Sequence, residues 1–181
     1  MWGGGANEMD EVQRLIQAFG ARRAMNSPAA KLDVLMDLER LGDPRLVPFL
    51  LQVLGDPSES ADVRMHALKR LRSGPLTADE RPTVARAFGE LMLHGSSIEL
   101  RLQAAVALGE FTDIEGVVRA LGSLALEPQE LLDLRYSAFT SLEPAGCTAE
   151  CVVVLRQLSH DEMLGRSAQS ALARWHVDYR E

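Results

Sequence analysis

Two cysteines and four histidines are the residues that metal or nucleophilic chemistry would use first. Cys147 and Cys151 are four residues apart, a spacing that places both on one face of a helix. The histidines are His66, His94, His160 and His176, and none has the paired spacing of a zinc site. We therefore expect both cysteines to be buried in a helical core, and we predict no metal, no cofactor and no catalytic residue.

Neighbouring carboxylates would suit acid–base catalysis. Asp79-Glu80 and Asp161-Glu162 are such pairs, but each stands where a helix is predicted to begin. A carboxylate in that place accepts backbone N–H groups and faces the positive end of the helix dipole. We interpret both pairs as helix caps, so the sequence predicts a protein that is not an enzyme.

The one local concentration of positive charge lies on a single predicted helix. It consists of Arg64, Lys69, Arg70 and Arg72. Such a cluster can meet an acidic partner or a phosphate, or it can be the solvated face of a helix. The whole chain has a net charge of −7. Because nucleic-acid binding relies on concentrated positive charge, this balance makes a nucleic-acid partner the weakest of the candidate functions.

The composition is that of a folded helical protein. Hydrophobic residues make up 46% of the 181 residues, whereas aromatic residues make up 5%. With two cysteines, a disulfide framework is not expected. No apolar run is long enough to span a membrane, and Met1 to Asp10 lacks the basic and apolar regions of a secretory signal. We expect a cytoplasmic protein with no membrane partner and a flexible N-terminal tail over residues 1–7.

An internal repeat organises the chain. In each copy a small residue follows the first position by three residues, and a leucine follows the small residue by four. The first positions are Lys31, Arg64, Arg101, Arg135 and Gly165, which are 33, 37, 34 and 30 residues apart. These offsets place the small residue and the leucine on one helical stripe. A neighbouring helix can approach the small residue, while the leucine fills the remaining space.

Another helix is predicted between successive copies. Asp43-Pro44 indicates the start of one such helix, and Gly55-Asp56-Pro57 indicates its end. The expected caps of the others are Thr77 with Glu80 as a capping box, Asp113, and Thr148. The run from Cys151 to Leu155 is rich in valine but follows Thr148, so we expect it to be helical. The pattern predicts about ten helices in five hairpins.

Two stretches of the chain resemble HEAT repeats. Residues Asp43-Pro44-Arg45-Leu46-Val47-Pro48-Phe49-Leu50, followed by Asp62-Val63-Arg64-Met65-His66-Ala67-Leu68, match one unit, and Leu100 to Gly109 match the second helix of another. The resemblance is to the short HEAT-like repeats of phycobilisome-lyase relatives, and it extends over about Ser27 to Val177. It implies an all-α protein, a right-handed α-solenoid of about five antiparallel hairpins, forming a single domain over residues 8–181.

The resemblance also implies a scaffold or adaptor role, with the second helices lining a concave face. By the repeat register, six residues lie outward on that face: His66, Lys69, Gln103, Val106, Ser137 and Thr140. Together with Arg70 of the basic cluster they form a predicted strip. The strip is expected to be basic at one end and neutral further along. We predict that a partner protein binds there.

The arginine column of the repeat, Arg64, Arg101 and Arg135, has two interpretations. It could be a ladder that binds a ligand. It could equally be structural, each arginine pairing with an acid or a carbonyl group of the neighbouring repeat. Because the column recurs together with the core pattern, we favour the structural interpretation.

Other functions stay open. Some relatives of the resembled family are lyases, so a domain that binds a pigment or another small molecule is the first alternative, although no catalytic residue of those relatives maps onto this chain. A nucleic-acid binder is the second alternative, and the net charge of −7 opposes it. Trp175 and Tyr179 are expected on one face of the last helix, where they could cover the end of the array or make an oligomer contact.

Overall fold

The computed structural model describes residues 9–24 and 27–179, and within these residues the chain is helical without strands. The expected tail over residues 1–7 lies outside this range. The chain divides between Arg70 and Leu71 into two compact units, which we call unit 1 and unit 2. The expectation of a single domain over residues 8–181 stays a prediction. No helix in the described part of the chain combines the length and the apolar character needed to cross a membrane.

The helix boundaries fit the expected hairpins. Unit 1 contains α1 (Glu11–Ala24), α2 (Pro28–Leu41), α3 (Leu46–Gly55) and most of α4 (Ala61–Ser73). Unit 2 contains α5 (Glu80–His94), α6 (Ile98–Leu108), α7 (Val117–Leu126), α8 (Leu132–Thr140), α9 (Ala149–Leu158) and α10 (Gly165–Arg174). Two short 3-10 turns, η1 (Gly109–Phe111) and η2 (Glu143–Ala145), complete it. The all-helical prediction is confirmed for the described residues, including the valine-rich start of α9.

In unit 1 the helices pack as two pairs. The hairpin of α1 and α2 packs along its length. The rings of Phe19 on α1 and Phe49 on α3 meet edge to face, with their centroids 5.2 Å apart. Lys31 on α2 binds Glu59, which lies two residues before α4, with a 2.7 Å contact between Nζ and Oε2. First helices therefore contact first helices, and second helices contact second helices.

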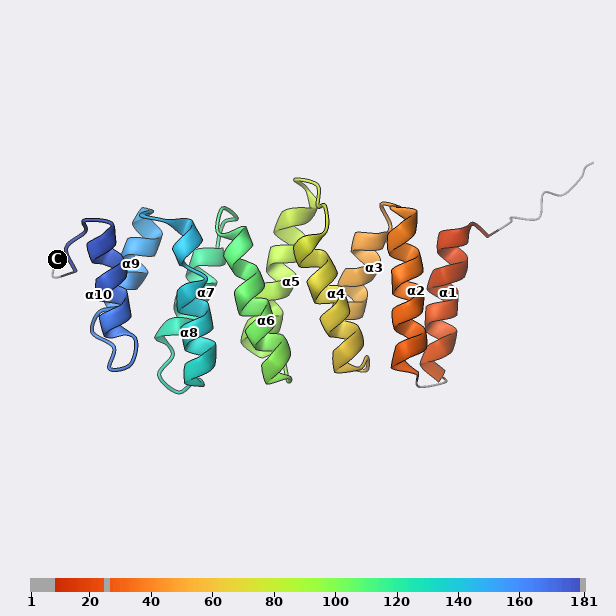
Figure 1. Cartoon of the computed structure of the whole chain (residues 1–181), viewed down its shortest axis with the longest axis horizontal. Coiled ribbons are helices and arrows are strands. Elements are labelled where there is room, and N and C mark those ends of the chain that lie inside the picture. The colour runs from red at the N-terminus through yellow and green to blue at the C-terminus, as the bar shows by residue number, and fades with distance from the viewer. Residues whose placement is uncertain (1–8, 25–26, 180–181) are drawn as a thin grey trace, which may run out of the picture. The chain divides into compact units, whose positions relative to one another are not determined.

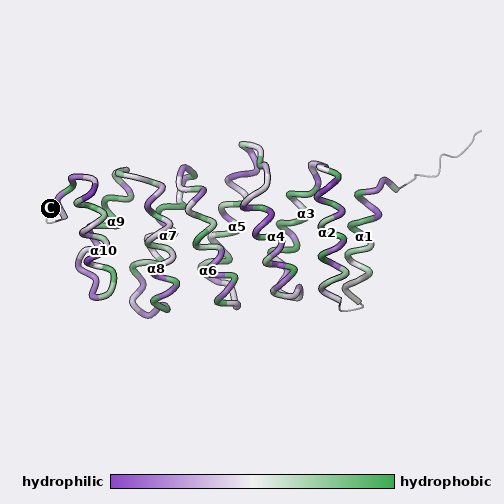
Figure 2. The backbone as a smooth tube through the Cα atoms, viewed as in Figure 1, coloured by the Kyte–Doolittle hydropathy of each residue, from purple (hydrophilic) through white to green (hydrophobic). Residues whose placement is uncertain are grey.

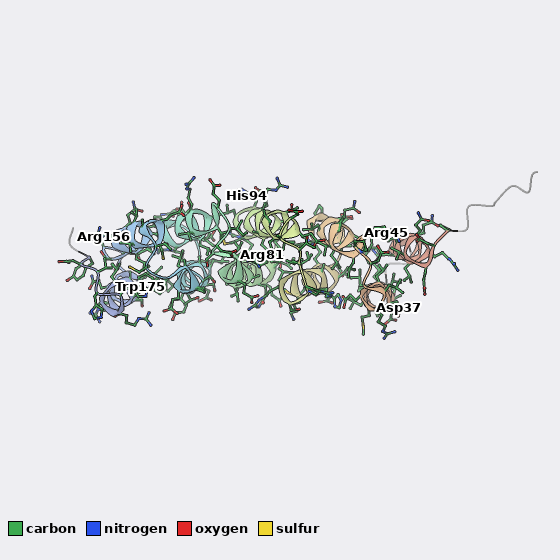
Figure 3. The ribbon with its side chains drawn as sticks, turned by 90° about the horizontal axis from the view of Figure 1, so that it is seen from above. Asp37, Arg45, Arg81, His94, Arg156 and Trp175 are labelled. Atoms are coloured by element: carbon green, nitrogen blue, oxygen red, sulfur yellow. The ribbon has the colours of Figure 1, made fainter. Side chains whose placement is uncertain are left out.

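Unit 2 repeats this arrangement over three hairpins. The helices α5 and α6, α7 and α8, and α9 and α10 pair with each other along the chain. Between hairpins, α7 contacts α5 and α9, while α6 contacts α8. Two layers result, which Figure 1 shows from the side and Figure 3 shows from above. We call α5, α7 and α9 the first layer and α6, α8 and α10 the second layer.

The predicted apolar stripe faces the interior of the helix pairs. The small residues and the leucines of all five copies are buried: Val34, Leu38, Ala67, Leu71, Ala104, Leu108, Ala138, Leu142, Ala168 and Leu172. Figure 2 shows hydrophobic and hydrophilic residues alternating along each helix, as expected for helices with one buried side. In unit 2 the rings of Phe88 and Phe111 add an edge-to-face contact at 5.7 Å. The inner seam of the repeat is therefore as predicted.

The expected helix caps are mostly present. The backbone N–H of Thr77 donates to Glu80, and the N–H of Glu80 donates to the hydroxyl of Thr77, which is the predicted capping box. Thr148 accepts from the N–H of Cys151 at the start of α9. Asp161 accepts from the N–H groups of Met163 and Leu164 in the turn before α10, but the N-cap residue of that helix is Leu164, which has no side-chain cap. Asp79 is the N-cap residue of α5 and makes no side-chain cap bond either, so the cap interpretation is wrong for Asp79.

The predicted cap at Asp113 is wrong. The helix begins four residues later, at Val117, after Gly116 in a left-handed conformation with φ of 85°. The carboxylate of Asp113 instead accepts from Arg81 at 2.7 Å. The guanidinium of Arg81 also lies 4.8 Å from the centre of the Phe111 ring, at the junction of the two layers (Figure 3). A tertiary ion pair has therefore replaced the local capping interaction.

The expectation for the C-terminal aromatic pair is also wrong. Helix α10 ends at Arg174, and Trp175 is its C-terminal cap residue. His176 then turns the chain with a φ of 57°. Trp175 and Tyr179 therefore do not share a helix face, because the left-handed residue between them ends the helical spacing. Self-association through this region stays a prediction.

Two helix-interior glycines lead to opposite predictions for the same substitution. An added Cβ at Gly122 would lie 2.7 Å from Cγ2 of the buried Val154, whereas an added Cβ at Gly89 would have no atom within 4 Å. We expect Gly89→Ala to raise the free energy of unfolding by about 0.5–1 kcal/mol through helix propensity. We expect Gly122→Ala to lower it, because overpacking typically costs about 1–3 kcal/mol.

Thermal or urea unfolding of both variants measures the two shifts. Truncation of the clashing side chain in Gly122→Ala/Val154→Ala should recover part of the loss. Shifts of the same sign in Gly89→Ala and Gly122→Ala would contradict the packing between α7 and α9 described here.

Candidate functional site

The basic positions of the repeat lie at the same place in each second helix. The backbone N–H of Lys31, Arg64, Arg101, Arg135 and Gly165 donates to the carbonyl of the residue four positions earlier, at the start of each second helix. We call the first four of these residues the basic column. Their register with the helix start shows that the repeat deduced from the sequence has a common structural origin.

Each arginine of the basic column binds the end of the preceding helix. The Nε atom of Arg64 donates to the carbonyl of Leu54 at 2.9 Å. Arg101 donates to Met92 and Arg135 donates to Ala125 in the same way, at 2.7 and 2.9 Å. A guanidinium group in this place satisfies a carbonyl that the helix itself leaves without a partner, and it complements the negative end of the helix dipole.

The basic column also bridges successive hairpins. Lys31 pairs with Glu59, Arg101 pairs with Glu130, and Arg135 pairs with Asp161. Each of these acids lies shortly before the next second helix: Glu59 and Glu130 are two residues before α4 and α8, and Asp161 is in the turn before α10. The structural interpretation of the arginine column is therefore confirmed for Arg101 and Arg135, whereas Arg64, among the described residues, bonds only to the carbonyl of Leu54 within its own hairpin. Arg101 and Arg135 hold hairpins together and are not aligned toward solvent as a ligand ladder.

Two acids of these bridges, Glu130 and Asp161, have lowered pKa values. The guanidinium of Arg101, together with the backbone N–H of Leu131, keeps the pKa of Glu130 below its ordinary value despite partial burial. Burial by itself would raise the pKa of Asp161. The N–H groups of Leu164 and Met163 and the Arg135 guanidinium outweigh that effect, so the pKa of Asp161 is also lowered.

The predicted strip lies in both units. In unit 1, His66 and Arg70 extend from α4 to the same carboxylate, Glu39 on α2, with distances of 2.7 Å from His66 Nε2 and 3.8 Å from Arg70 Nε. Lys69 is exposed. An acid that is 27 residues from His66 in the sequence thus counters much of the positive charge that the strip was expected to present there.

The rest of the basic cluster is also engaged within the chain. Arg64 is buried, so it is neither a solvated residue nor a contact for a partner. In unit 2, Arg72 binds Glu110, with 2.7 Å between Nε and Oε1. An acidic partner or a phosphate would have to compete with these internal carboxylates.

In unit 2 the predicted strip occupies two neighbouring helices. Gln103 and Val106 lie on α6, and Ser137 and Thr140 lie on α8. Val106 is exposed, whereas the other three are half-buried. The Thr140 hydroxyl donates to the carbonyl of Ser137 at 3.0 Å, so it is engaged within its own helix. Because α6 contacts α8, these four residues belong to one layer.

Large exposed apolar residues accompany the strip in unit 2. Six of the seven such residues described in this unit lie on the second layer or in the turns that lead into it: Ile98, Val106, Leu131, Leu132, Tyr136 and Met163. We call these six residues the second-layer surface. The seventh, Val153, lies on α9 in the first layer. The second layer of unit 2 therefore exposes more large apolar residues to solvent than the first layer does.

Five members of the second-layer surface were missed by the sequence analysis. Only Val106 belongs to both sets. Leu131 and Leu132 fall directly before the repeated core motif that begins at Asp133, outside the buried stripe of α8. Two adjacent leucines outside the predicted buried stripe of the helix were the signal that could have identified them as exposed.

The first layer of unit 2 is hollowed between α5 and α7. A pocket of about 640 Å³ lies there, which we call the α5–α7 pocket. Its floor is apolar and includes Ala85, Leu108 and Val117, all buried. Four charged residues line it: Arg86, Glu90, Asp113 and Glu115. This volume is in the range of ligand-binding clefts, and the mixture of an apolar floor with few charges is typical of them.

The two cysteines have different environments. Cys151 is buried, its Sγ donates to the carbonyl of Leu142 at 3.7 Å, and burial raises the pKa of its thiol to about 11. Cys147 is exposed in the loop before Thr148, so the prediction that both are buried is wrong for this residue. Across the described residues, no group of three or more His, Cys, Asp or Glu side chains is arranged to hold a metal ion.

Comparison with known proteins does not assign the chain to a family. No protein-family model matches the sequence, and no curated protein matches it either. The functional argument therefore depends on the residues and contacts described above.

Removing one partner of the buried ion pair in unit 1 should destabilise the fold more than replacing both partners with uncharged residues. The side chains of Lys31 and Glu59 are 7% and 4% exposed, and the Lys31 ammonium lies 4.9 Å from the centre of the Phe19 ring. Lys31→Met leaves a buried carboxylate without a counter-charge, so we expect it to lower the free energy of unfolding by about 3–5 kcal/mol. The double variant Lys31→Met/Glu59→Gln should recover most of that loss in urea unfolding. A double variant no more stable than Lys31→Met would be evidence against this account.

The bridge between Arg101 and Glu130 should respond to acid. A carboxyl group whose pKa is lowered in the folded state contributes stability above its unfolded pKa, which is about 4.3 for glutamate. This contribution is lost as the pH falls through the lowered native pKa. We expect Glu130→Gln to reduce the melting temperature at pH 7, and we expect the difference from the wild type to shrink below about pH 4. A difference that stays constant down to pH 2 would rule out this linkage.

Proposed function

We propose that this chain is a HEAT-like helical-repeat protein, a right-handed solenoid of hairpins, that acts as a non-catalytic scaffold or adaptor. In this proposal its partner is another protein, which binds the second helices. The observation that carries it is the concentration of exposed apolar residues on the second layer of unit 2. Tyr136, 52% exposed at the middle of α8, is the aromatic member of that surface. Aromatic residues are enriched at the centres of protein interfaces.

The basic column supports the same proposal. Its charges are used in bonds to helix ends and to the acids of neighbouring hairpins. Rigidly held helices lose little conformational freedom when a partner binds, which favours affinity. The part of the strip on α6 and α8 then provides polar contacts beside the apolar ones. Gln103 and Ser137 are half-buried members of this kind.

The alternatives have less support. Nucleic-acid binding is opposed by the net charge of −7. A lyase-type domain would enclose its pigment, but the charged residues that line the α5–α7 pocket are exposed at its rim. We place the protein in the cytoplasm as part of the same proposal, in keeping with two cysteines that are both free thiols.

Matched surface variants can test the proposal. Val106→Lys/Tyr136→Lys places two charges on the second-layer surface, and Val153→Lys, on the first layer, is the control because Val153 is also exposed. Immobilised protein would capture partners from a lysate of the native organism, and quantitative mass spectrometry would identify them. The strongest candidate would then be purified and its Kd measured by calorimetry.

We expect the double variant to weaken binding of the purified partner by at least about tenfold, since truncation or disruption at an interface centre typically costs more than about 1.4 kcal/mol. Val153→Lys should bind as the wild type does. Circular dichroism would establish that all three proteins are folded. Equal affinity for the double variant and the wild type would exclude the second layer as the binding face.

A further inference from the structure

The α5–α7 pocket contains a helix-interior glycine that packing does not require. Gly89 lies in the middle of α5, where glycine costs about 1 kcal/mol relative to alanine. Two other helical glycines of unit 2 have a neighbour that excludes a side chain: Val154 lies beside Gly122, and the carbonyl of Ser159 lies beside Gly165. A Cβ at Gly89 would meet nothing within 4 Å. Glycine at this position is therefore not needed for the close approach of another helix. Its missing side chain instead leaves open space at the pocket.

Unit 1 shows the same combination independently. Gly20 lies within α1, an added Cβ there would also meet nothing within 4 Å, and the residue lines a pocket of about 250 Å³ between α1 and α3. Phe19 and Phe49 contribute aromatic surface to that pocket. An open glycine beside a hollow between first helices thus occurs in both units, and the larger hollow is the one in unit 2.

The charges around the α5–α7 pocket favour a positively charged occupant. Three carboxylates, Glu90, Asp113 and Glu115, line it together with a single guanidinium, Arg86. Asp113 is paired with Arg81, and Glu90 lies 4.0 Å from His94. Glu115 and Arg86 form no salt bridge with any other described residue. Because Arg81 offsets Asp113 and Arg86 offsets one of the other two carboxylates, a single negative charge is left at the pocket, which agrees in sign with the net charge of −7.

We infer that the α5–α7 pocket binds a peptide segment of a partner protein that carries a bulky apolar side chain flanked by lysine or arginine. The apolar side chain occupies the space left by Gly89 and covers Leu93, Ile114 and Val117. The flanking cations lie at the exposed rim beside Glu90 and Glu115. This site extends the proposed binding role to the first layer, and it rests on that role only in assuming a protein partner.

Substitutions at Gly89 and at the rim predict four separate outcomes for the affinity of the peptide. Gly89→Trp fills the pocket from a position where the Cβ atom meets nothing within 4 Å. Gly89→Leu is a second filling variant with a smaller side chain. Gly89→Ala is the matched control, because it adds a methyl group and leaves most of the space open. Glu115→Lys removes negative charge from the rim, whereas Arg86→Glu adds it.

The probe is a displayed random-peptide library selected on the immobilised wild-type protein, followed by calorimetry of the enriched peptides against each variant. We expect enriched peptides to combine a large apolar residue with neighbouring lysine or arginine. Their affinity should fall at least about tenfold in Gly89→Trp or Gly89→Leu, stay within about threefold in Gly89→Ala, fall in Glu115→Lys and rise in Arg86→Glu.

Three results would overturn the inference: no enrichment of any peptide, enriched peptides without basic residues, or affinity that is unchanged by filling the pocket. Each peptide would also be measured against Val106→Lys/Tyr136→Lys. Peptides that lose affinity in that variant but not in Gly89→Trp would refute the pocket site while supporting the second-layer surface. The reverse pattern would support the pocket site alone.

Discussion

The repeat depends on a positive charge at the fourth position of a second helix, which binds a helix end, an acid of the next hairpin or, for Arg101 and Arg135, both. A buried ammonium or guanidinium group is stable only when it is paired and hydrogen-bonded. Lys31 and Arg135 meet this condition through Glu59 and Asp161, and Arg135 in addition binds the carbonyl of Ala125. The need to satisfy each charge fixes the register of the helices it joins, which apolar packing by itself leaves free to slide.

This constraint also divides the surface by chemistry. The charges most repeated in the sequence are directed inward, so the residues left for binding are those that the repeat does not need. In unit 2 the second layer exposes Tyr136 and the apolar turns before its helices. The first layer instead has a hollow whose floor is apolar and whose rim is mostly acidic. The two layers therefore differ in surface chemistry: the second exposes apolar residues, whereas the first combines an apolar floor with a charged rim.

The sequence predicted what depends on local rules and missed what depends on distant pairs. The buried stripe of Ala104 and Leu108 follows from helical spacing, and the Thr77–Glu80 capping box follows from residues three positions apart. By contrast, Asp113 was assigned to a cap because nothing in its neighbourhood reveals Arg81, which is 32 residues away. Gly89 is similar, since its role depends on the space around it and not on its place in the chain.

The basic column couples neighbouring hairpins, and a double-mutant cycle on Arg135 and Asp161 measures this coupling. Asp161→Asn keeps an oxygen to accept from Met163 and Leu164 while removing the charge that faces Arg135, and Arg135→Met removes the other partner. Urea unfolding of the wild type, the two single variants and the double variant gives the coupling energy. We expect a coupling energy of about 1 kcal/mol or more. A loss of unfolding free energy in the double variant that equals the sum of the two single losses to within about 0.3 kcal/mol would show that the two residues are not coupled.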